Sequence, residues 1–261
     1  IEISDHHAKI IKDRCILCGH CTKICPQNAK VVHTEKDGVA KLLSGKNKVV
    51  ASVAPSFVSS FKSQNFADIA DALRKLGFDY AEETAVGAKV VTEEYIKLLK
   101  TNTFKNFITS ACPAVNRMIQ LYHHDALKYL APVDTPMIAH AKILKKRFPD
   151  ADVVFIGPCI AKKREAEESG LIKAVLTFDD FNALLEEKGV TLGQSAVNET
   201  DGACNKARYY PISRGIIKSF PDYPENYEYV AVDGVERVNE VLENIESFSG
   251  LFLELNCCEY A

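Results

Sequence analysis

The chain has 261 residues, a formal net charge of −3 and 47% hydrophobic residues. This mildly acidic balance excludes a strongly basic surface, so we expect neither nucleic acid nor an anionic membrane as a partner. No apolar run approaches the roughly 18 residues of a membrane span, and no secretory signal is visible.

The nine cysteines are the most informative part of the composition. An odd number in a chain of this size is not typical of a disulfide framework. Clustered cysteines without secretory features indicate reduced thiolates that bind metal. We therefore expect a reducing, cytoplasmic setting.

Residues 1–45 are polar and cysteine-rich, and we predict a separate module that is closed by the linker-like sequence LLSGKNK. The spacing C-x2-C-x2-C-x3-C-P is formed by Cys15, Cys18, Cys21 and Cys25, with Pro26 next. A loop with this spacing directs three thiolates to one iron–sulfur cubane, and the fourth thiolate leaves on the following helix. We predict a [4Fe–4S] site of the ferredoxin type, with zinc as the alternative.

The fourth cysteine of this motif leaves an alternative open. In two-cluster ferredoxins it serves the other cluster of the pair. If Cys25 does so here, its partner motif must precede Ile1, and we expect such a motif upstream.

Residues 46–261 alternate between short β-branched or apolar runs and helical patterns. The predicted strands are 48–53, 78–83, 106–110, 152–157, 173–177, 227–232 and 251–255. The predicted helices include 68–77, 138–148, 179–189 and 235–245, the third with Thr177 or Asp179 as its N-cap. This alternation predicts an α/β fold with parallel sheets covered by helices. Residues 195–211 are polar and predict a loop, which contains Cys204.

The later cysteines follow three of the predicted strands. Cys112 follows 106–110, Cys159 follows 152–157, and Cys257 and Cys258 follow 251–255. The carboxyl ends of parallel strands are where open α/β sheets build sites. A single cysteine in such a place is more often a buried structural thiol, but three equivalent places favour a metal site.

Three segments around these cysteines carry a resemblance to a known family. TSACPAVN, GPCIAKKREAE and LELNCCEYA resemble the signatures TSCCPxW, MPCxxKxxE and ExMACxxGC of the iron-only ([FeFe]) hydrogenases. ASVAPSF resembles the family's Ala-Pro-Ser segment, and VGAKVVTEEY resembles its FGADLTxxEE stretch. The resemblance covers nearly the whole chain in order. It implies two mostly parallel sheets flanked by helices, with the site between two lobes and half of a ferredoxin-like module in front.

The resemblance further implies an H-cluster, in which a [4Fe–4S] cubane is joined to a diiron unit that carries CO, cyanide and a dithiolate. By motif position Cys112, Cys159 and Cys258 would hold the cubane, and Cys257 falls on a family alanine. The fourth ligand would lie one residue beyond Ala261, so we expect the chain to continue.

The same resemblance implies residues around the diiron unit. Ala54, Pro55, Ser56 and Pro158 would line it, and Lys162 would donate to a cyanide ligand, as suits a fixed ammonium beside an anion. For Ser56 a helix N-cap, and for Lys162 a solvated helix start, are the structural alternatives.

Several family positions are changed. Ala111 stands where the family has its proton-relay cysteine, and a methyl group cannot carry a proton. The family methionines are replaced by Gly157 and Asn256. The family Trp that follows the proline is absent, and Val115 and Asn116 stand in that place. Glu93 and Glu94 remain, but Lys97 follows where an acid is expected.

These departures resemble the sensory hydrogenases, which are thought to bind H2 and turn it over slowly. We therefore expect an H2 sensor that relays electrons through [4Fe–4S] clusters to a redox or signalling partner. A homodimer is compatible with this role. The alternatives are a turnover hydrogenase with an altered proton path and a non-enzymatic relative that acts in iron–sulfur assembly with [4Fe–4S] clusters alone. A degenerate fragment that only carries electrons is the third alternative.

Overall fold

The strands are arranged in three sheets in the computed structural model, which describes residues 1–4, 7–61, 65–193 and 206–259. The strands are β1 Glu2–Ser4, β2 His7–Lys9, β3 Val49–Val53, β4 Tyr80–Glu83, β5 Phe107–Ile108, β6 Asp152–Ile156, β7 Ala174–Leu176, β8 Glu228–Asp233 and β9 Leu251–Asn256. The helices are α1 His20–Ile24, α2 Lys36–Leu43, α3 Phe57–Ser60, α4 Phe66–Leu76, α5 Ala85–Lys100, α6 Pro113–Tyr122, α7 Pro136–Arg147, α8 Ala161–Ser169, α9 Phe178–Lys188, α10 Gly215–Ser219 and α11 Val235–Glu243. Short 3-10 helices span Lys12–Arg14, His124–Tyr129, Lys206–Tyr209 and Ile245–Ser247.

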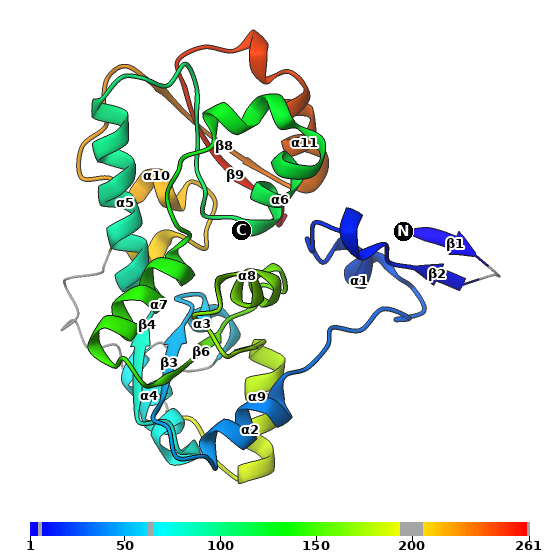
Figure 1. Ribbon diagram of the computed structural model, residues 1–261, viewed down its shortest axis with the longest axis vertical. Helices are drawn as coiled ribbons and strands as arrows, with labels where there is room; N and C mark the ends of the chain where they lie inside the picture. Colours follow the sequence, from blue (N-terminus) through cyan, green and yellow to red (C-terminus); the bar gives the residue numbers. More distant parts are fainter. Residues whose placement is uncertain (5–6, 62–64, 194–205, 260–261) are drawn as a thin grey trace.

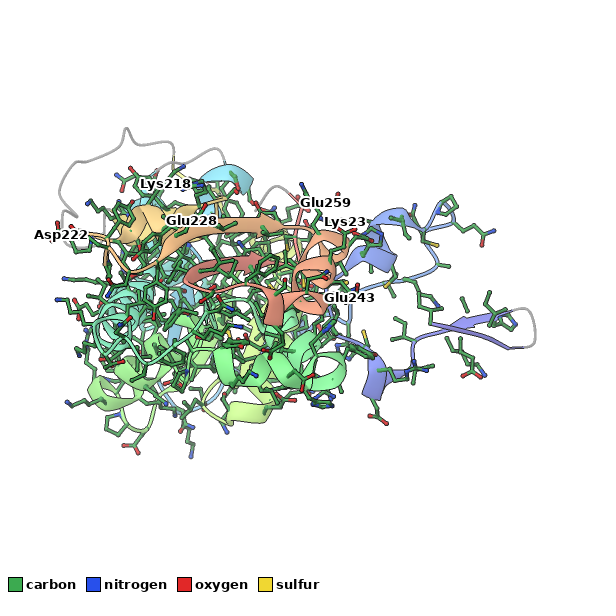
Figure 2. The ribbon with its side chains drawn as sticks, turned by 90° about the horizontal axis from the view of Figure 1, so that it is seen from above. Lys23, Lys218, Asp222, Glu228, Glu243 and Glu259 are labelled. Carbon is green, nitrogen blue, oxygen red and sulfur yellow. The ribbon has the colours of Figure 1, made fainter. Side chains whose placement is uncertain are left out.

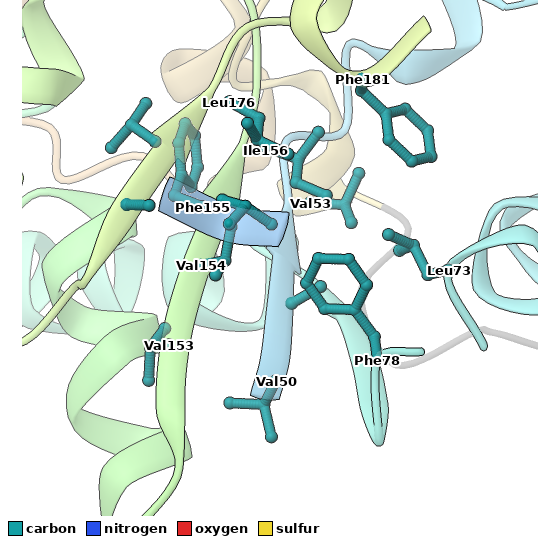
Figure 3. Packing of buried hydrophobic residues seen from close by; sticks show 14 of the residues in the cluster. Val50, Val53, Leu73, Phe78, Val153, Val154, Phe155, Ile156, Leu176 and Phe181 are labelled. Carbon is teal, nitrogen blue, oxygen red and sulfur yellow. The ribbon is translucent and has the colours of Figure 1, made fainter. Parts of the chain in front are cut away.

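The larger sheet is parallel, with the strand order β4-β3-β6-β7. Every residue of β3 and of β6 is buried, as expected for strands covered by helices on both faces. Figure 3 shows the packing around them, where Val53 and Ile156 meet Leu73 of α4 and Phe181 of α9. This cluster is the core of the lower lobe in Figure 1.

The smaller sheet is also parallel, with the strand order β5-β9-β8. Its core is aromatic: the rings of Phe107 and Phe252 stack with centroids 5.4 Å apart, and Phe220 meets Phe252 edge-on at 5.3 Å. Such offset and edge contacts are the favoured arrangements of aromatic pairs. This sheet, with α6 and α11, forms the upper lobe in Figure 1.

Helix α5 joins the two lobes. It leaves the larger sheet after β4, packs against α7 and reaches α10 of the upper lobe. Where it crosses α7, a Cβ on Gly87 would lie only 2.3 Å from the carbonyl oxygen of Pro136. Only glycine therefore allows the helices to approach this closely.

The N-terminal hairpin extends away from both lobes, while the loop that follows it packs on the upper lobe through Ile16 and Leu17. Strands β1 and β2 form an antiparallel hairpin, and Figure 1 shows them beside α1 at the edge of the molecule. The chain returns to the lower lobe at Glu35, which accepts hydrogen bonds from Lys163 Nζ at 3.0 Å and from the amide of Val175 at 2.9 Å. Helix α2 then packs on the lower core through buried Val39.

The α/β fold predicted from the sequence is confirmed. All seven strands predicted between residues 48 and 255 are present, and the four helices are present with ends shifted by up to two residues. Thr177 caps α9 by a capping box with Asp180, so it is the cap rather than Asp179. Most of the predicted loop 195–211, with Cys204, lies outside the described residues. None of the described helices is long and apolar enough to cross a membrane.

Candidate iron–sulfur sites

The cysteines predicted at strand ends lie at the ends of the observed strands. Cys112 follows β5 and caps α6, and Cys159 follows β6 and precedes α8. Cys257 and Cys258 follow β9. Because β5 and β9 are neighbours in one sheet and β6 belongs to the other, the cysteines approach one another from both lobes.

Cys112 and Cys257 lie close to each other. The interaction with buried Cys257 lowers the pKa of the Cys112 thiol, although burial opposes this. Cys159 lies within electrostatic range of Cys112 and Cys258, and burial raises its pKa to about 11. The structure thus brings these four cysteines into one neighbourhood, with Cys257 buried and Cys258 exposed.

Lys162 is the cation of this neighbourhood. Its residue is 9% exposed, and Nζ donates to Glu165 Oε2 at 2.8 Å within the first turn of α8. Its charge acts on both Cys112 and Cys159, in each case lowering the pKa of the thiol. A buried ammonium beside two thiols favours negative charge on their sulfurs.

The segment after β3 lies against the end of β6. The amide of Ala54 donates to the carbonyl of Ile156 at 2.8 Å, and a Cβ on Gly157 would lie 2.9 Å from the Ala54 methyl. Ala54 is buried, Pro55 and Ser56 are partly exposed, and Pro158 is exposed. Ser56 precedes α3 without a capping hydrogen bond from its side chain, so the structure does not support the N-cap alternative.

The four cysteines of the N-terminal motif lie in different surroundings. Cys18 lies within electrostatic range of Cys15 and Cys21, and burial raises its pKa. The pKa of Cys25 is lowered, first by hydrogen bonds from the amides of Ala29 and Gln27 and then by Lys30 and the amide of Asn28. Both alternatives for Cys25, the same cluster or another one, are compatible with these surroundings.

The N-terminal loop lies directly against the later cysteines. Cys18 acts electrostatically on Cys257 and Cys258, and a small cavity is lined by these three residues together with Lys23 and Glu259. Figure 2 shows Lys23 and Glu259 next to each other where the two parts of the chain meet. The hydroxyl of Tyr122 on α6 donates a hydrogen bond to the carbonyl oxygen of Arg14 in this loop.

Comparison with known proteins identifies the family. The model described as "Iron only hydrogenase large subunit, C-terminal domain" matches residues 47–261. The chain belongs to this family. A second model, the 4Fe-4S binding domain, matches residues 8–31, so the iron-only hydrogenase domain follows a segment of the [4Fe–4S] type.

Individual iron-only hydrogenases resemble the chain more distantly. The NADP-reducing hydrogenase subunit HndD of Solidesulfovibrio fructosivorans is 27% identical over 178 residues, which cover 58% of this chain and 30% of that protein. The solved apo [FeFe]-hydrogenase HydA1 of Chlamydomonas reinhardtii is similar with a TM-score of 0.64 and 14% identity, over 87% of this chain and 82% of that one. Another [FeFe]-hydrogenase, solved in work on oxygen inactivation of its H cluster, gives a TM-score of 0.65 at 15% identity with the same coverage. These structural similarities establish the fold.

At the positions that depart from the hydrogenase signatures, the residues present make other contacts. At Gly157 a Cβ would lie 2.8 Å from the ring of Phe155, so the ring takes the space of the missing methionine. Asn256 turns to Asp233 on β8 with an Nδ2–Oδ1 distance of 3.1 Å. Glu94 pairs with Lys97 at 2.6 Å on the exposed side of α5, and Glu93 is exposed. These acids therefore face solvent rather than the cysteines.

The residues present fit an iron–sulfur cluster, because its ligands are cysteine thiolates. Among the described residues, no group of three or more His, Cys, Asp or Glu side chains is arranged to hold one ion. A cubane needs separated thiolates, since its irons sit at different corners. The cysteine neighbourhood supplies these, together with the favourable charge of Lys162. When bound there, such a cluster supplies one-electron transfer.

The sequence did not reveal two features of this site. Cys257 lies close to Cys112 although the two residues are 145 positions apart in the sequence. The motif position of Cys257 corresponds to an alanine in the family signature, so the sequence predicts no role for its thiol. The hydroxyl of buried Tyr95 lies behind Ala111, where it accepts a hydrogen bond from the amide of Ser110 at 2.8 Å. Its apolar neighbours in α5 made Tyr95 indistinguishable from a packing residue.

Proposed function

We propose that this protein is an H2 sensor, which binds H2 at an H-cluster, oxidises it slowly and passes the electrons on through [4Fe–4S] clusters. The observation that carries the proposal is Ala111, which stands between Ser110 and Cys112 where the family has its proton-relay thiol. General acid–base groups contribute about 10²–10⁴-fold to rates. An enzyme that lacks one at this point is suited to reporting H2 rather than consuming it.

In this proposal the domain boundary lies near residue 45. Cys112, Cys159 and Cys258 hold the cubane of the H-cluster. Ala54, Pro55, Ser56 and Pro158 line the diiron unit, and Lys162 donates to its cyanide. Support comes from the buried position of Lys162 beside Cys112 and Cys159 and from the contact between the β3 and β6 ends.

Electrons leave through the N-terminal module, where Cys15, Cys18 and Cys21, with or without Cys25, hold a [4Fe–4S] cluster. The closeness of Cys18 to Cys257 and Cys258 supports this route, because electrons tunnel only between clusters that are near each other. The acceptor is a redox or signalling protein.

The test uses the full-length protein matured with the diiron unit. We expect infrared bands of CO and cyanide, together with H2 evolution from reduced viologen that is slow. Ala111→Cys should raise this rate about 100-fold because it restores the relay. Ala111→Val, which adds volume but no exchangeable proton, is the matched control and should not raise it.

Two outcomes would replace the proposal. Fast H2 evolution by the unchanged protein would favour a turnover hydrogenase with another proton path. Full loading with iron but no CO or cyanide bands would favour the assembly relative with [4Fe–4S] clusters alone.

A further inference from the structure

A tyrosine hydroxyl lies immediately behind Ala111. Tyr95 on α5 is fully buried, and its oxygen accepts a hydrogen bond from the amide of Ser110 at 2.8 Å, with the amide of Ala111 also directed to it. The same oxygen lies 2.9 Å from Ser110 Oγ, and either hydroxyl can donate. A chain of exchangeable protons therefore begins next to the residue that replaces the relay thiol.

A buried carboxyl lies farther along the same region. Glu254 on β9 is fully buried, and its Oε2 accepts from the amide of Ile217 at 2.9 Å. Its second oxygen, Oε1, has no hydrogen-bond partner among the described residues, and neither has Oγ1 of buried Thr109. Because Ile108 is the register partner of Leu253, Thr109 follows β5 at the level of Glu254. Two polar atoms without partners at one level of a sheet are a place where a bridging water is expected.

A second group of hydroxyls lies near the carboxyl. Thr92 Oγ1 lies 2.9 Å from the hydroxyl of Tyr210 and 2.9 Å from Ser219 Oγ. Tyr210 lies within electrostatic range of both Tyr95 and Glu254. Thr92 and Ser219 are buried, and the Tyr210 hydroxyl that meets them is enclosed although the residue as a whole is partly exposed.

We propose that Ser110, Tyr95 and Glu254, followed by the hydroxyls of Tyr210 and Thr92, form a proton route that leads away from Ala111 in place of the thiol relay. The inference rests on the proposed function, because it concerns the proton that H2 oxidation releases. Each step exchanges one proton and breaks one O–H bond for each one formed. A proton that arrives at Ser110 Oγ displaces the hydrogen of that hydroxyl to Tyr95. Tyr95 then gives its own hydroxyl hydrogen, through the water expected beside Thr109, to the Glu254 carboxylate, which holds it as the neutral acid. When Glu254 passes the proton to the Tyr210 hydroxyl, Tyr210 gives up its own hydrogen to Thr92 Oγ1, and Thr92 gives up its hydrogen to Ser219 Oγ.

The electrostatics of Glu254 suit this task. Burial raises its pKa to about 7, while amide hydrogen bonds from the start of α10 oppose the rise. Tyr95, Tyr210 and Asp233 lie within electrostatic range of it, and Asp233 contributes to the raised pKa. A carboxyl in this range takes up and releases protons near neutral pH. Burial raises the pKa of Tyr95 well above its usual value, so Tyr95 acts by exchanging its hydroxyl proton and stays neutral.

A purely structural role would use the same hydrogen bonds to satisfy buried polar groups. The two roles differ in what Tyr95→Phe does. A structural role predicts lower stability only, whereas a relay predicts that the protonation of Glu254 changes and that proton release slows.

The first measurement needs no diiron unit. Infrared spectra of the full chain in H2O and D2O should show a carboxylic C=O band near neutral pH that shifts in D2O. This band should disappear in Glu254→Gln and move in Tyr95→Phe. Tyr129→Phe is the matched control: Tyr129 is also buried, but its hydroxyl bonds Glu246 at 3.0 Å outside this region, so the band should stay. Absence of the band, or no response to Tyr95→Phe, overturns the proposal.

The second measurement is isotope exchange between H2 and D2O by the matured protein. We expect Tyr95→Phe and Glu254→Gln to slow it about tenfold or more, and Tyr129→Phe to leave it unchanged. Exchange in the parent protein that persists in both variants overturns the relay but leaves the sensor proposal standing. A parent protein that carries the CO and cyanide bands but shows no exchange instead contradicts the proposed function. If Glu254→Gln does not fold, Tyr95→Phe decides alone.

Discussion

The ring of Phe155 lies where a side chain on Gly157 would have to be. Two of its ring carbons are 2.8 Å from the ideal Cβ position of Gly157, and the Ala54 methyl closes the other side at 2.9 Å. The two residues therefore constrain each other: a bulky residue at 155 is compatible only with glycine at 157. This pair shapes the junction of the β3 and β6 ends beside Cys159.

Gly157→Met, which introduces the family residue, should lower the free energy of unfolding by about 1–3 kcal/mol, because the side chain overpacks this junction. Combining it with Phe155→Ala should recover part of the loss, since the ring is then absent. Urea unfolding of the cluster-free protein measures both. Gly38→Ala is the control: its Cβ meets nothing within 4 Å on α2, and alanine should stabilise by about 0.5–1 kcal/mol. Equal effects at residues 38 and 157 would contradict the packing argument.

Lys162→Met should destabilise the protein by about 3 kcal/mol, because it leaves the Glu165 carboxylate largely buried without its cation. The double variant Lys162→Met with Glu165→Gln should recover most of this loss. Thermal and urea unfolding test the cycle. Lys97→Met is the control, since its pair with Glu94 is exposed and should change stability little. A double variant as unstable as the single one would show that the pair is not the cause.

Glu82 should make stability depend on acid pH. Burial raises its pKa, but hydrogen bonds from His140, Arg147 and Tyr80 outweigh this and hold it at about 2. Because the folded-state pKa is lowered from 4.5, the stabilisation is present above about pH 4.5 and is lost as the pH falls toward 2. We expect the loss to be about 3 kcal/mol in urea unfolding of the cluster-free protein.

Glu82→Gln should flatten this pH dependence between pH 5 and about 2. Asp71→Asn is the control, because Asp71 pairs with Lys75 at the exposed surface of α4 and should leave the slope nearly unchanged. A slope that survives in Glu82→Gln would assign the acid sensitivity to other carboxyls.

Cys18 and Cys25 should differ in their effect on the N-terminal cluster. Cys18 lies within electrostatic range of Cys15 and Cys21, whereas amide hydrogen bonds lower the pKa of Cys25, which could serve a different cluster. After reconstitution, Cys18→Ala should therefore lose most of the cluster's iron and its electron paramagnetic resonance signal, while Cys25→Ala should retain more of both. Equal losses in the two variants would assign Cys25 to the same cluster as the other three.

Much of the fold was predictable because its determinants are local. The central strands of the larger sheet, β3 and β6, are short apolar runs that are buried on both faces. The start of α9 is determined by the capping box of Thr177 and Asp180. The likeness to iron-only hydrogenases was equally local, since it rests on spacings within short segments around Cys112, Cys159 and Cys258. The order of these segments along the chain was sufficient for the family.

The contacts among these segments depended on the tertiary structure. The register of β5 on β9 brings Thr109 to the level of Glu254, and the crossing of α5 with α7 at Gly87 accompanies the burial of Tyr95 behind Ala111. No spacing in the sequence encodes these distances, because each one joins elements that are remote along the chain. The sequence by itself determined that residue 111 is alanine, where the signature of the resembling family has a cysteine. Only the folded chain decided that the Tyr95 hydroxyl lies beside this residue and that the Glu254 carboxyl is buried nearby, because these positions are remote along the chain.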